Sequence, residues 1–413
     1  MGSRHLLILV ATGLLPSPPS PQEIPEWRRF EQALRPPKFK NFELTFWPDF
    51  RPIIDLAGPE ADKALERFAE HPEELGLKTN LDRVLLQRSV WAFFDAHSRS
   101  WRRVDPDNLD HWLDGPPKQQ KPVRKLEQAA KILKITTAGL KEEDVRALPD
   151  SYARTLDSKT YAEEFDESNP GRPFLPPGLL KLNGPWICLG SSTDVPLALH
   201  HLQYFGVRST FLVFFRVPGG REAGLAFAKV LQEDLRKQRP EDPLPQMPAG
   251  TQVALVEQCL VVTADRKIIP SPLVETVQLR VYRKPDRPFD FQHEDSQAVF
   301  VFRLVGDLLR SEDRPPLRAL GKEESDWEPA FVRVELCRSG PWDMRSASPF
   351  FCTMCHGAPG TESLLFHQDL RLGFFQKAGP RKLDIVTPPS ERERIARWKE
   401  KDETWKDLES FWR

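Results

Sequence analysis

The chain has 413 residues, of which 59 are basic and 60 acidic, so its formal net charge is −1 at pH 7. A protein that grips nucleic-acid phosphates needs a basic surplus, and this balance implies no such surface. Hydrophobic residues make up 39% and charged residues 29%, enough for a sizeable core, and the length favours two packed domains or one large α+β unit.

The first residues have the order of a secretory signal peptide. Arg4 and His5 precede an apolar run over 6–15, and a proline-rich segment follows it. The apolar run is far shorter than the roughly 20 residues that a membrane-spanning helix needs. We therefore expect residues 1–20 to be a signal peptide and the exported mature chain, periplasmic or extracellular, to have no integral membrane span. A buried N-terminal helix is the alternative, because no clean A-x-A cleavage site is present.

Residues 21–165 have helical periodicity. The segment 81–97 has a broad apolar stripe at 3.6-residue spacing, and Asn80 stands where an N-cap is expected. Two further helices are predicted at 123–133 and 141–148, the second beginning with acidic residues that suit a helix N-terminus.

Residues 166–345 are expected to form an antiparallel α+β domain, because the hydrophobic period changes to two from Gly184 onward. A short hairpin turn is predicted at 264–266, and hairpin-type connections outnumber helical crossovers. This pattern favours a largely antiparallel sheet with helices against one face. The predicted strands are 210–217, 252–263, 272–282, 298–304 and 331–337.

Residues 346–413 are expected to hold a functional loop and a terminal helix. The helix is predicted over 390–413 as one amphipathic element with tryptophans on its apolar face. The loop contains Cys352-Thr-Met-Cys355-His356, a C-x-x-C-H motif. Two residues between the thiols let both sulfurs reach the vinyl groups of a haem, and the adjoining histidine can bind the iron. The motif predicts one covalent haem c.

The sequence from Cys352 to Gly360 resembles the haem loop of c-type cytochromes, in which glycines follow the histidine and let the backbone pass close to the haem. More loosely, the chain resembles a group of uncharacterised exported bacterial proteins with one such motif near the C-terminus. That resemblance implies no activity, and it is carried by the stretches 81–87, 248–254 and 275–281.

The second iron ligand departs from the pattern of small c-type cytochromes, which place a methionine downstream of the motif. No methionine follows His356 here. His367 is the predicted second ligand, and His200, His201 or an open coordination position are alternatives.

The cysteine pair has other interpretations. Cys352 and Cys355 can form a disulfide or a redox-active dithiol, with His356 lowering a thiol pKa. Zinc would need two more ligands, for which Cys337 or His367 is available. Cys259 and Cys337 lie in strand-like apolar runs and are expected to be core thiols.

The sequence thus predicts an exported c-type haem protein that transfers electrons to an unknown redox partner or senses redox state. A haem enzyme of the peroxidase type, with an open distal position, is one alternative. An exported structural or interaction protein, in which the cysteine pair is a disulfide, is the other.

Overall fold

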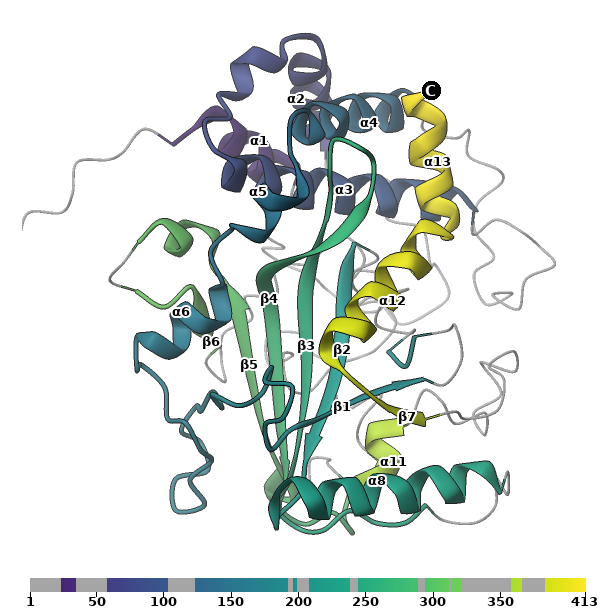
Figure 1. Cartoon of the computed structure of the whole chain (residues 1–413). Helices are drawn as coiled ribbons and strands as arrows, with labels where there is room; N and C mark the ends of the chain where they lie inside the picture. Colours follow the sequence, from purple (N-terminus) through teal and green to yellow (C-terminus); the bar gives the residue numbers. More distant parts are fainter. Residues whose placement is uncertain are drawn as a thin grey trace, which may run out of the picture.

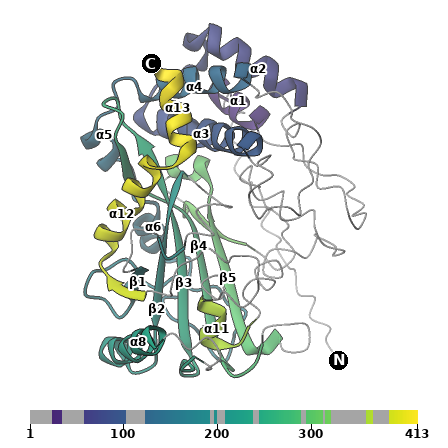
Figure 2. The same cartoon turned by 90° about the vertical axis from the view of Figure 1, so that its right-hand side faces the viewer.

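The structure is a computed structural model whose described residues are 24–34, 58–102, 123–191, 196–198, 208–237, 244–288, 294–311, 314–320, 358–365 and 383–413. It combines a long antiparallel sheet with helices packed at both of its ends (Figure 1). Figure 2 shows the N-terminal helices over one end of the sheet and two other helices, α8 (Gly220–Arg236) and α11 (Gly360–Leu365), at the opposite end. The predicted α+β fold is confirmed.

The helical region is the part of the chain from α1 to α6, and its longest helix, α3, confirms the helix predicted over 81–97. The N-cap of α3 is Thr79 and not Asn80: Thr79 Oγ1 accepts from the Asp82 amide at 3.1 Å, and an Asp82 carboxylate oxygen accepts from the Thr79 amide at 3.0 Å. This reciprocal capping box fixes the start of the helix. The elements are α1 (Glu26–Leu34), α2 (Gly58–Glu70), η1 (Pro72–Leu75), α3 (Asn80–Arg102), α4 (Val123–Thr137), α5 (Glu142–Arg146) and α6 (Ser151–Asp157).

The sheet has seven strands among the described residues, in the order β6-β5-β4-β3-β2-β1-β7, and every pairing is antiparallel. The predicted hairpin turn at 264–266 joins β3 to β4. The predicted strand 331–337 lies outside the described residues. The strands are β1 (Ile187–Ser191), β2 (Ser209–Arg216), β3 (Thr251–Val262), β4 (Ile268–Tyr282), β5 (Gln297–Leu304), β6 (Leu317–Ala319) and β7 (Leu383–Val386). Two 3-10 turns, η2 (Glu294–Ser296) and η3 (Gly306–Arg310), flank β5.

Helices lie against both faces of the sheet, so the expectation of a single helical face is wrong. On one face, Phe214 and Leu279 belong to the main hydrophobic core, which Ile395 of α12 joins. On the other face, Phe215 and Val253 form a second apolar cluster with α8 (Gly220–Arg236) and with α11 (Gly360–Leu365). Strand residues alternate between faces, and here both faces are apolar enough to bury a helix.

The C-terminal segment forms two helices instead of the single helix predicted over 390–413. They are α12 (Pro388–Glu400) and α13 (Glu403–Trp412). The two helices are separated at Asp402. Its carboxylate accepts a hydrogen bond from the Thr404 amide at 2.9 Å and so caps α13. The Trp412 indole donates to the Ala130 carbonyl in α4 at 2.7 Å, which ties α13 to the helical region.

The thiols of Cys188 and Cys259 are free and buried in the sheet, as predicted for Cys259. Burial raises the pKa of the Cys259 thiol to about 12, so it stays protonated and unreactive at neutral pH. Within the described ranges, no helix is long and apolar enough to cross a membrane.

Candidate functional site

The residues predicted to carry and ligate a haem, Cys352, Cys355, His356 and His367, lie outside the described residues. The described chain resumes at Ala358, two residues after His356. The helix that follows, α11, is the first described element after the motif, and its contacts define the candidate site.

The first turn of α11 is held by the segment that joins α8 to β3. The Thr361 hydroxyl donates to the Pro245 carbonyl at 2.7 Å, and the Thr361 amide donates to Gln246 Oε1 at 3.3 Å. In the reverse direction, the Leu244 amide donates to a Glu362 carboxylate oxygen at 3.4 Å. These contacts fix the helix to the end of the sheet at which β3 begins (Figure 1).

The second turn of α11 packs on β4. The Tyr282 hydroxyl donates to Ser363 Oγ at 3.1 Å, and both side chains are buried. Leu365 enters the second apolar cluster, which also contains Leu244 and Met247. Burial raises the pKa of Tyr282, so its hydroxyl keeps its proton and remains a donor. Polar and apolar contacts together hold α11 in one position.

Gly360 begins α11 at a place where no side chain fits. Its φ is +41°, and a Cβ there would lie 2.8 Å from the Pro285 carbonyl oxygen and would also collide with the Gln246 amide. From the sequence pattern, this glycine is expected to let the backbone pass close to a haem. In the structure, the close approach is to the chain's own segments at 246 and 285, and it lets α11 dock.

We expect Gly360→Ala to release α11 from the body of the protein. The positive φ costs alanine about 1–2 kcal/mol, and the collision with the Pro285 backbone adds to that. Hydrogen exchange should become faster in residues 360–365 and stay unchanged in β3. Gly171→Ala is the matched control, because nothing lies within 4 Å of a Cβ at Gly171. Unchanged exchange in α11 would show that the docking does not depend on this glycine.

Beside α11, three polar residues share one face of the sheet. Tyr282 and Gln297 are direct partners across β4 and β5, and Arg280, two residues before Tyr282, points to the same side. Arg280 Nη1 donates to Gln297 Oε1 at 3.5 Å. The Gln297 side chain is 4% exposed, and its amide nitrogen has no hydrogen-bond acceptor among the described residues. We call Arg280, Tyr282 and Gln297 the Arg280 site.

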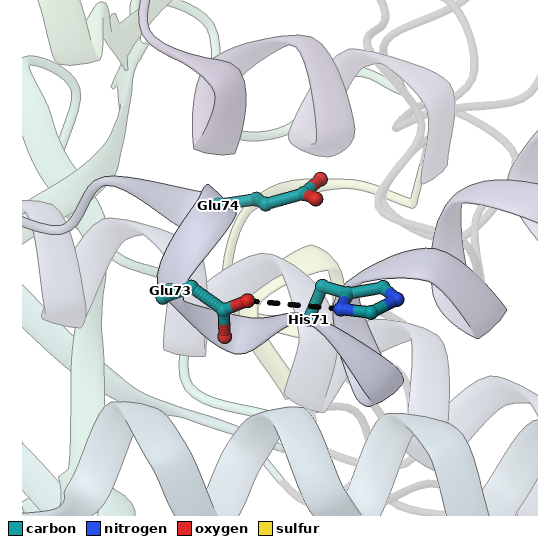
Figure 3. Close-up of side chains that lie close together, drawn as sticks. All are labelled: His71, Glu73 and Glu74. Carbon is teal, nitrogen blue, oxygen red and sulfur yellow. Dashed lines mark ion pairs between the residues drawn. The ribbon is translucent and has the colours of Figure 1, made fainter.

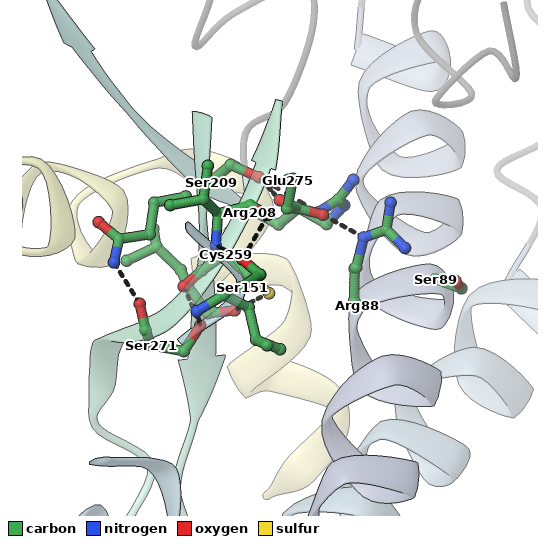
Figure 4. Close-up of polar contacts among 12 residues, drawn as sticks. Arg88, Ser89, Ser151, Arg208, Ser209, Cys259, Ser271 and Glu275 are labelled. Atoms are coloured by element: carbon green, nitrogen blue, oxygen red, sulfur yellow. Dashed lines mark hydrogen bonds and ion pairs between the residues drawn. The ribbon is translucent and has the colours of Figure 1, made fainter. Parts of the chain in front are cut away.

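A second buried polar group joins α3 to the far end of the sheet (Figure 4). Arg208 Nη1 lies 2.9 Å from both carboxylate oxygens of Glu275, and Ser209 Oγ donates to the same carboxylate at 2.6 Å. Arg88 of α3 also pairs with Glu275. Burial alone would raise the pKa of Glu275, but Arg208 and Arg88 outweigh it and hold that pKa at about 2. A carboxylate that is ionised and saturated with donors in this way is structural.

Figure 3 shows His71, Glu73 and Glu74, whose ligand atoms lie within 4.8 Å of one another at η1. All three side chains are exposed. Arg67 Nε already donates to Glu74 at 2.6 Å, and His71 Nδ1 lies 3.6 Å from Glu73. Because its three side chains are exposed and Glu74 is already paired, this group has the character of a solvated surface.

No protein-family model, curated protein or solved structure matches this chain. The functional argument therefore rests on its own residues.

Sequence reasoning did not find the Arg280 site or the partners of α11. The alternative ligands His200 and His201 lie outside the described residues. Met247 precedes the motif and so does not fit the cytochrome pattern, yet the structure packs it into the same apolar cluster as Leu365. A usable signal did exist: Thr276, Gln278, Arg280 and Tyr282 alternate with apolar residues on β4, and polar residues at buried strand positions demand partners.

Proposed function

We propose that this chain is an exported c-type haem protein that transfers electrons, or senses redox state, through one covalently attached haem. The observation that carries the proposal is the C-x-x-C-H spacing of Cys352, Cys355 and His356. Export, to the periplasm or beyond the cell, belongs to the same proposal. It is supported by the signal-like residues 1–20 and by the chemistry of haem c, which is attached outside the cytoplasm.

The surroundings of the loop's end support the proposal. The described chain resumes two residues after His356 and enters α11, which is fixed by hydrogen bonds to residues 244–246 and to Tyr282. A loop held at one end loses less freedom when a rigid group binds to it.

In this proposal a bound haem supplies one-electron redox chemistry, and the chain's residues attach and orient it. Cys352 and Cys355 would form the thioether links, His356 would be the first axial ligand, and His367 would be the second. Apolar residues near an iron centre exclude water and raise its reduction potential. We expect the apolar cluster that Leu365 joins to contribute to that role.

Haem attachment is tested by expressing the protein in a host that matures c-type cytochromes. We expect one haem per chain in a pyridine haemochrome assay, retained after acid-acetone extraction because the links are covalent. Cys352→Ala/Cys355→Ala should contain none. Cys188→Ala is the matched control and should keep the full haem content, because the Cys188 thiol is buried in β1.

A colourless wild-type protein would contradict the proposal. An intact mass that shows an oxidised Cys352–Cys355 pair would then support the disulfide alternative.

The second ligand is tested in the same preparation. His367→Ala should change the spectrum of the reduced protein and let it bind carbon monoxide, because it opens a coordination position. Met247→Leu, which keeps the volume of a buried side chain, should leave the spectrum unchanged. If Met247→Leu changed the spectrum and His367→Ala did not, Met247 would be the second ligand of the iron. Carbon monoxide binding by the wild type would favour the peroxidase-type alternative, which needs an open position.

A further inference from the structure

The outermost strands of the sheet, among the described residues, are β6 and β7, which lie at its two opposite edges (Figure 1). An edge strand has backbone amides and carbonyls that face away from its one neighbour, and such groups can pair with a strand of another chain. Successive residues of a strand direct these groups to opposite sides, so every second residue of an edge strand faces outward. At both edges of this sheet, side chains of the protein itself bind the outward groups.

At β6, the Tyr161 hydroxyl takes the place of a neighbouring strand. The Pro316 carbonyl accepts from β5 and the Leu320 amide donates to β5, so Leu317 and Ala319 between them face outward. Tyr161 Oη accepts from the Ala319 amide at 2.9 Å and donates to the Leu317 carbonyl at 3.3 Å. One hydroxyl therefore satisfies two successive outward groups.

The rest of this edge is held from α6 and from the packing of the tyrosine ring. The Leu317 amide donates to Thr155 Oγ1 at 3.1 Å, and Thr155 is buried. The Tyr161 ring packs edge-on against Phe302 of β5, with the two ring centroids 4.9 Å apart. The ring contact fixes the hydroxyl beside β6.

At β7, Gln232 of α8 and Asp384 of the strand itself have the corresponding role. Gln232 Nε2 donates to the Leu383 carbonyl at 3.2 Å and to Asp384 Oδ1 at 3.3 Å. The same Asp384 oxygen accepts from the Ile385 amide at 2.8 Å. As at β6, side chains bind a carbonyl and the amide two residues further along. The same arrangement thus occurs at both edges, built from different side chains.

We infer that Tyr161 at β6, and Gln232 with Asp384 at β7, are edge caps that prevent the sheet from pairing with the sheet of a second copy of this chain. A strand added at either edge would need the carbonyl and the amide that the cap binds. It would first have to displace the cap, whose polar groups would then lose their partners. The inference is independent of the proposed function, because no residue of the C-x-x-C-H motif takes part in it.

Tyr161→Phe tests the cap at β6 in the full-length protein, because it removes the hydroxyl and keeps the ring on Phe302. Hydrogen exchange resolved at single residues should be about tenfold or more faster at the Ala319 amide in dilute solution, since that amide loses its acceptor. Sedimentation velocity should give an average mass that rises above that of the wild type as the concentration increases. In the associated protein the Ala319 amide should be protected again, because the added strand bonds to it.

Tyr152→Phe is the matched control. It removes the same hydroxyl from a buried tyrosine whose acceptor, the Pro176 carbonyl at 2.6 Å, belongs to neither edge strand. Its mass should equal that of the wild type at every concentration. Equal association of Tyr152→Phe and Tyr161→Phe would assign the effect to lost stability and would overturn the inference.

Asp384→Ala tests the cap at β7 independently, and it should expose the Ile385 amide and cause association in the same way. Asp384→Asn removes the charge but keeps an acceptor for Ile385 and Gln232, so it should behave as the wild type. Unchanged exchange and mass in Tyr161→Phe and Asp384→Ala would overturn the inference, and so would faster exchange without association. If Tyr161→Phe does not fold, the comparison of Asp384→Ala with Asp384→Asn decides.

Discussion

Glu275→Gln should lower the free energy of unfolding by roughly 3–5 kcal/mol, the usual cost of removing one partner from a buried ion pair. The carboxylate is 2% exposed and neutralises Arg208 on the sheet and Arg88 on α3. An amide of the same shape leaves the buried Arg208 guanidinium without its anion and removes one of the two carboxylates that interact with Arg88. Urea unfolding followed by tryptophan fluorescence measures the loss. Glu164→Gln is the control, because its pair with Arg216 is exposed and should contribute less than about 1 kcal/mol.

The decrease in the free energy of unfolding caused by Glu275→Gln should also depend on pH. The pKa of Glu275 is lowered in the folded state to about 2 from an ordinary value of 4.5. A lowered pKa stabilises the folded protein fully above about pH 4.5, and this contribution disappears as the pH falls through about 2. Glutamine has no such titration, so the stability difference between the variant and the wild type should shrink over that interval. A difference that stays constant down to pH 2 would contradict the assigned role of the carboxylate.

Lys399→Met should cause a loss of similar size, roughly 3 kcal/mol or more, at the junction of α12, α13 and α3. The ammonium group is completely buried, lies 3.1 Å from an Asp95 carboxylate oxygen, and donates to the Thr404 hydroxyl at 2.7 Å. Methionine matches the length of the side chain but removes the charge that faces both Asp95 and Asp402, as well as the hydrogen bond to Thr404. Both thermal and urea unfolding should record the loss.

Lys406→Met is the control for Lys399, because it makes the same change in α13. Lys406 pairs with Glu403 at 2.7 Å, with both side chains more than half exposed. Such a pair contributes at most about 1 kcal/mol, so this variant should unfold close to the wild type. Equal losses in the two variants would mean that burial of the ammonium group does not set its contribution.

The elements that depend on local patterns were predictable. Helix α3 has an uninterrupted apolar stripe, and the turn between β3 and β4 separates two long apolar runs. The prediction began the strand at residue 272, but β4 already begins at Ile268 and includes both Pro270 and Pro272. The structure accommodates them where the pairing with β3 is irregular, since register shifts at 257–260 relax the demand for regular ladder hydrogen bonds.

The parts that depend on distant contacts were not predictable from local patterns. Strand β7 has only four residues, too few to show a period, and it exists because β1 offers an edge to pair with. The break between α12 and α13 depends on the Asp402 cap inside a segment that is otherwise amphipathic. Glu275 lies 67 residues from Arg208 and 187 from Arg88, so nothing local shows that they meet.

The same limit applies to the candidate site. The spacing of Cys352, Cys355 and His356 can be read directly, and its interpretation as a haem anchor remains a prediction. The contacts of α11 depend on the fold. Thr361 donates to the Pro245 carbonyl although 116 residues separate them, and Ser363 accepts from Tyr282 across a separation of 81 residues. The Arg280 site emerges only when two strands are placed in register, because Arg280 and Gln297 are 17 residues apart and separated by a turn.

The bond from Trp412 to Ala130 has a consequence for the order of folding, because it joins residues 282 positions apart. Trp405 and Trp412 of α13 complete the core formed by α3 and α4. While the chain is being made from its N-terminus, the helical region must wait for its last core residues. Until they arrive, apolar side chains of α3 and α4 are exposed, and contacts this far apart in sequence form slowly. The helical region is thus first in sequence and last to be completed.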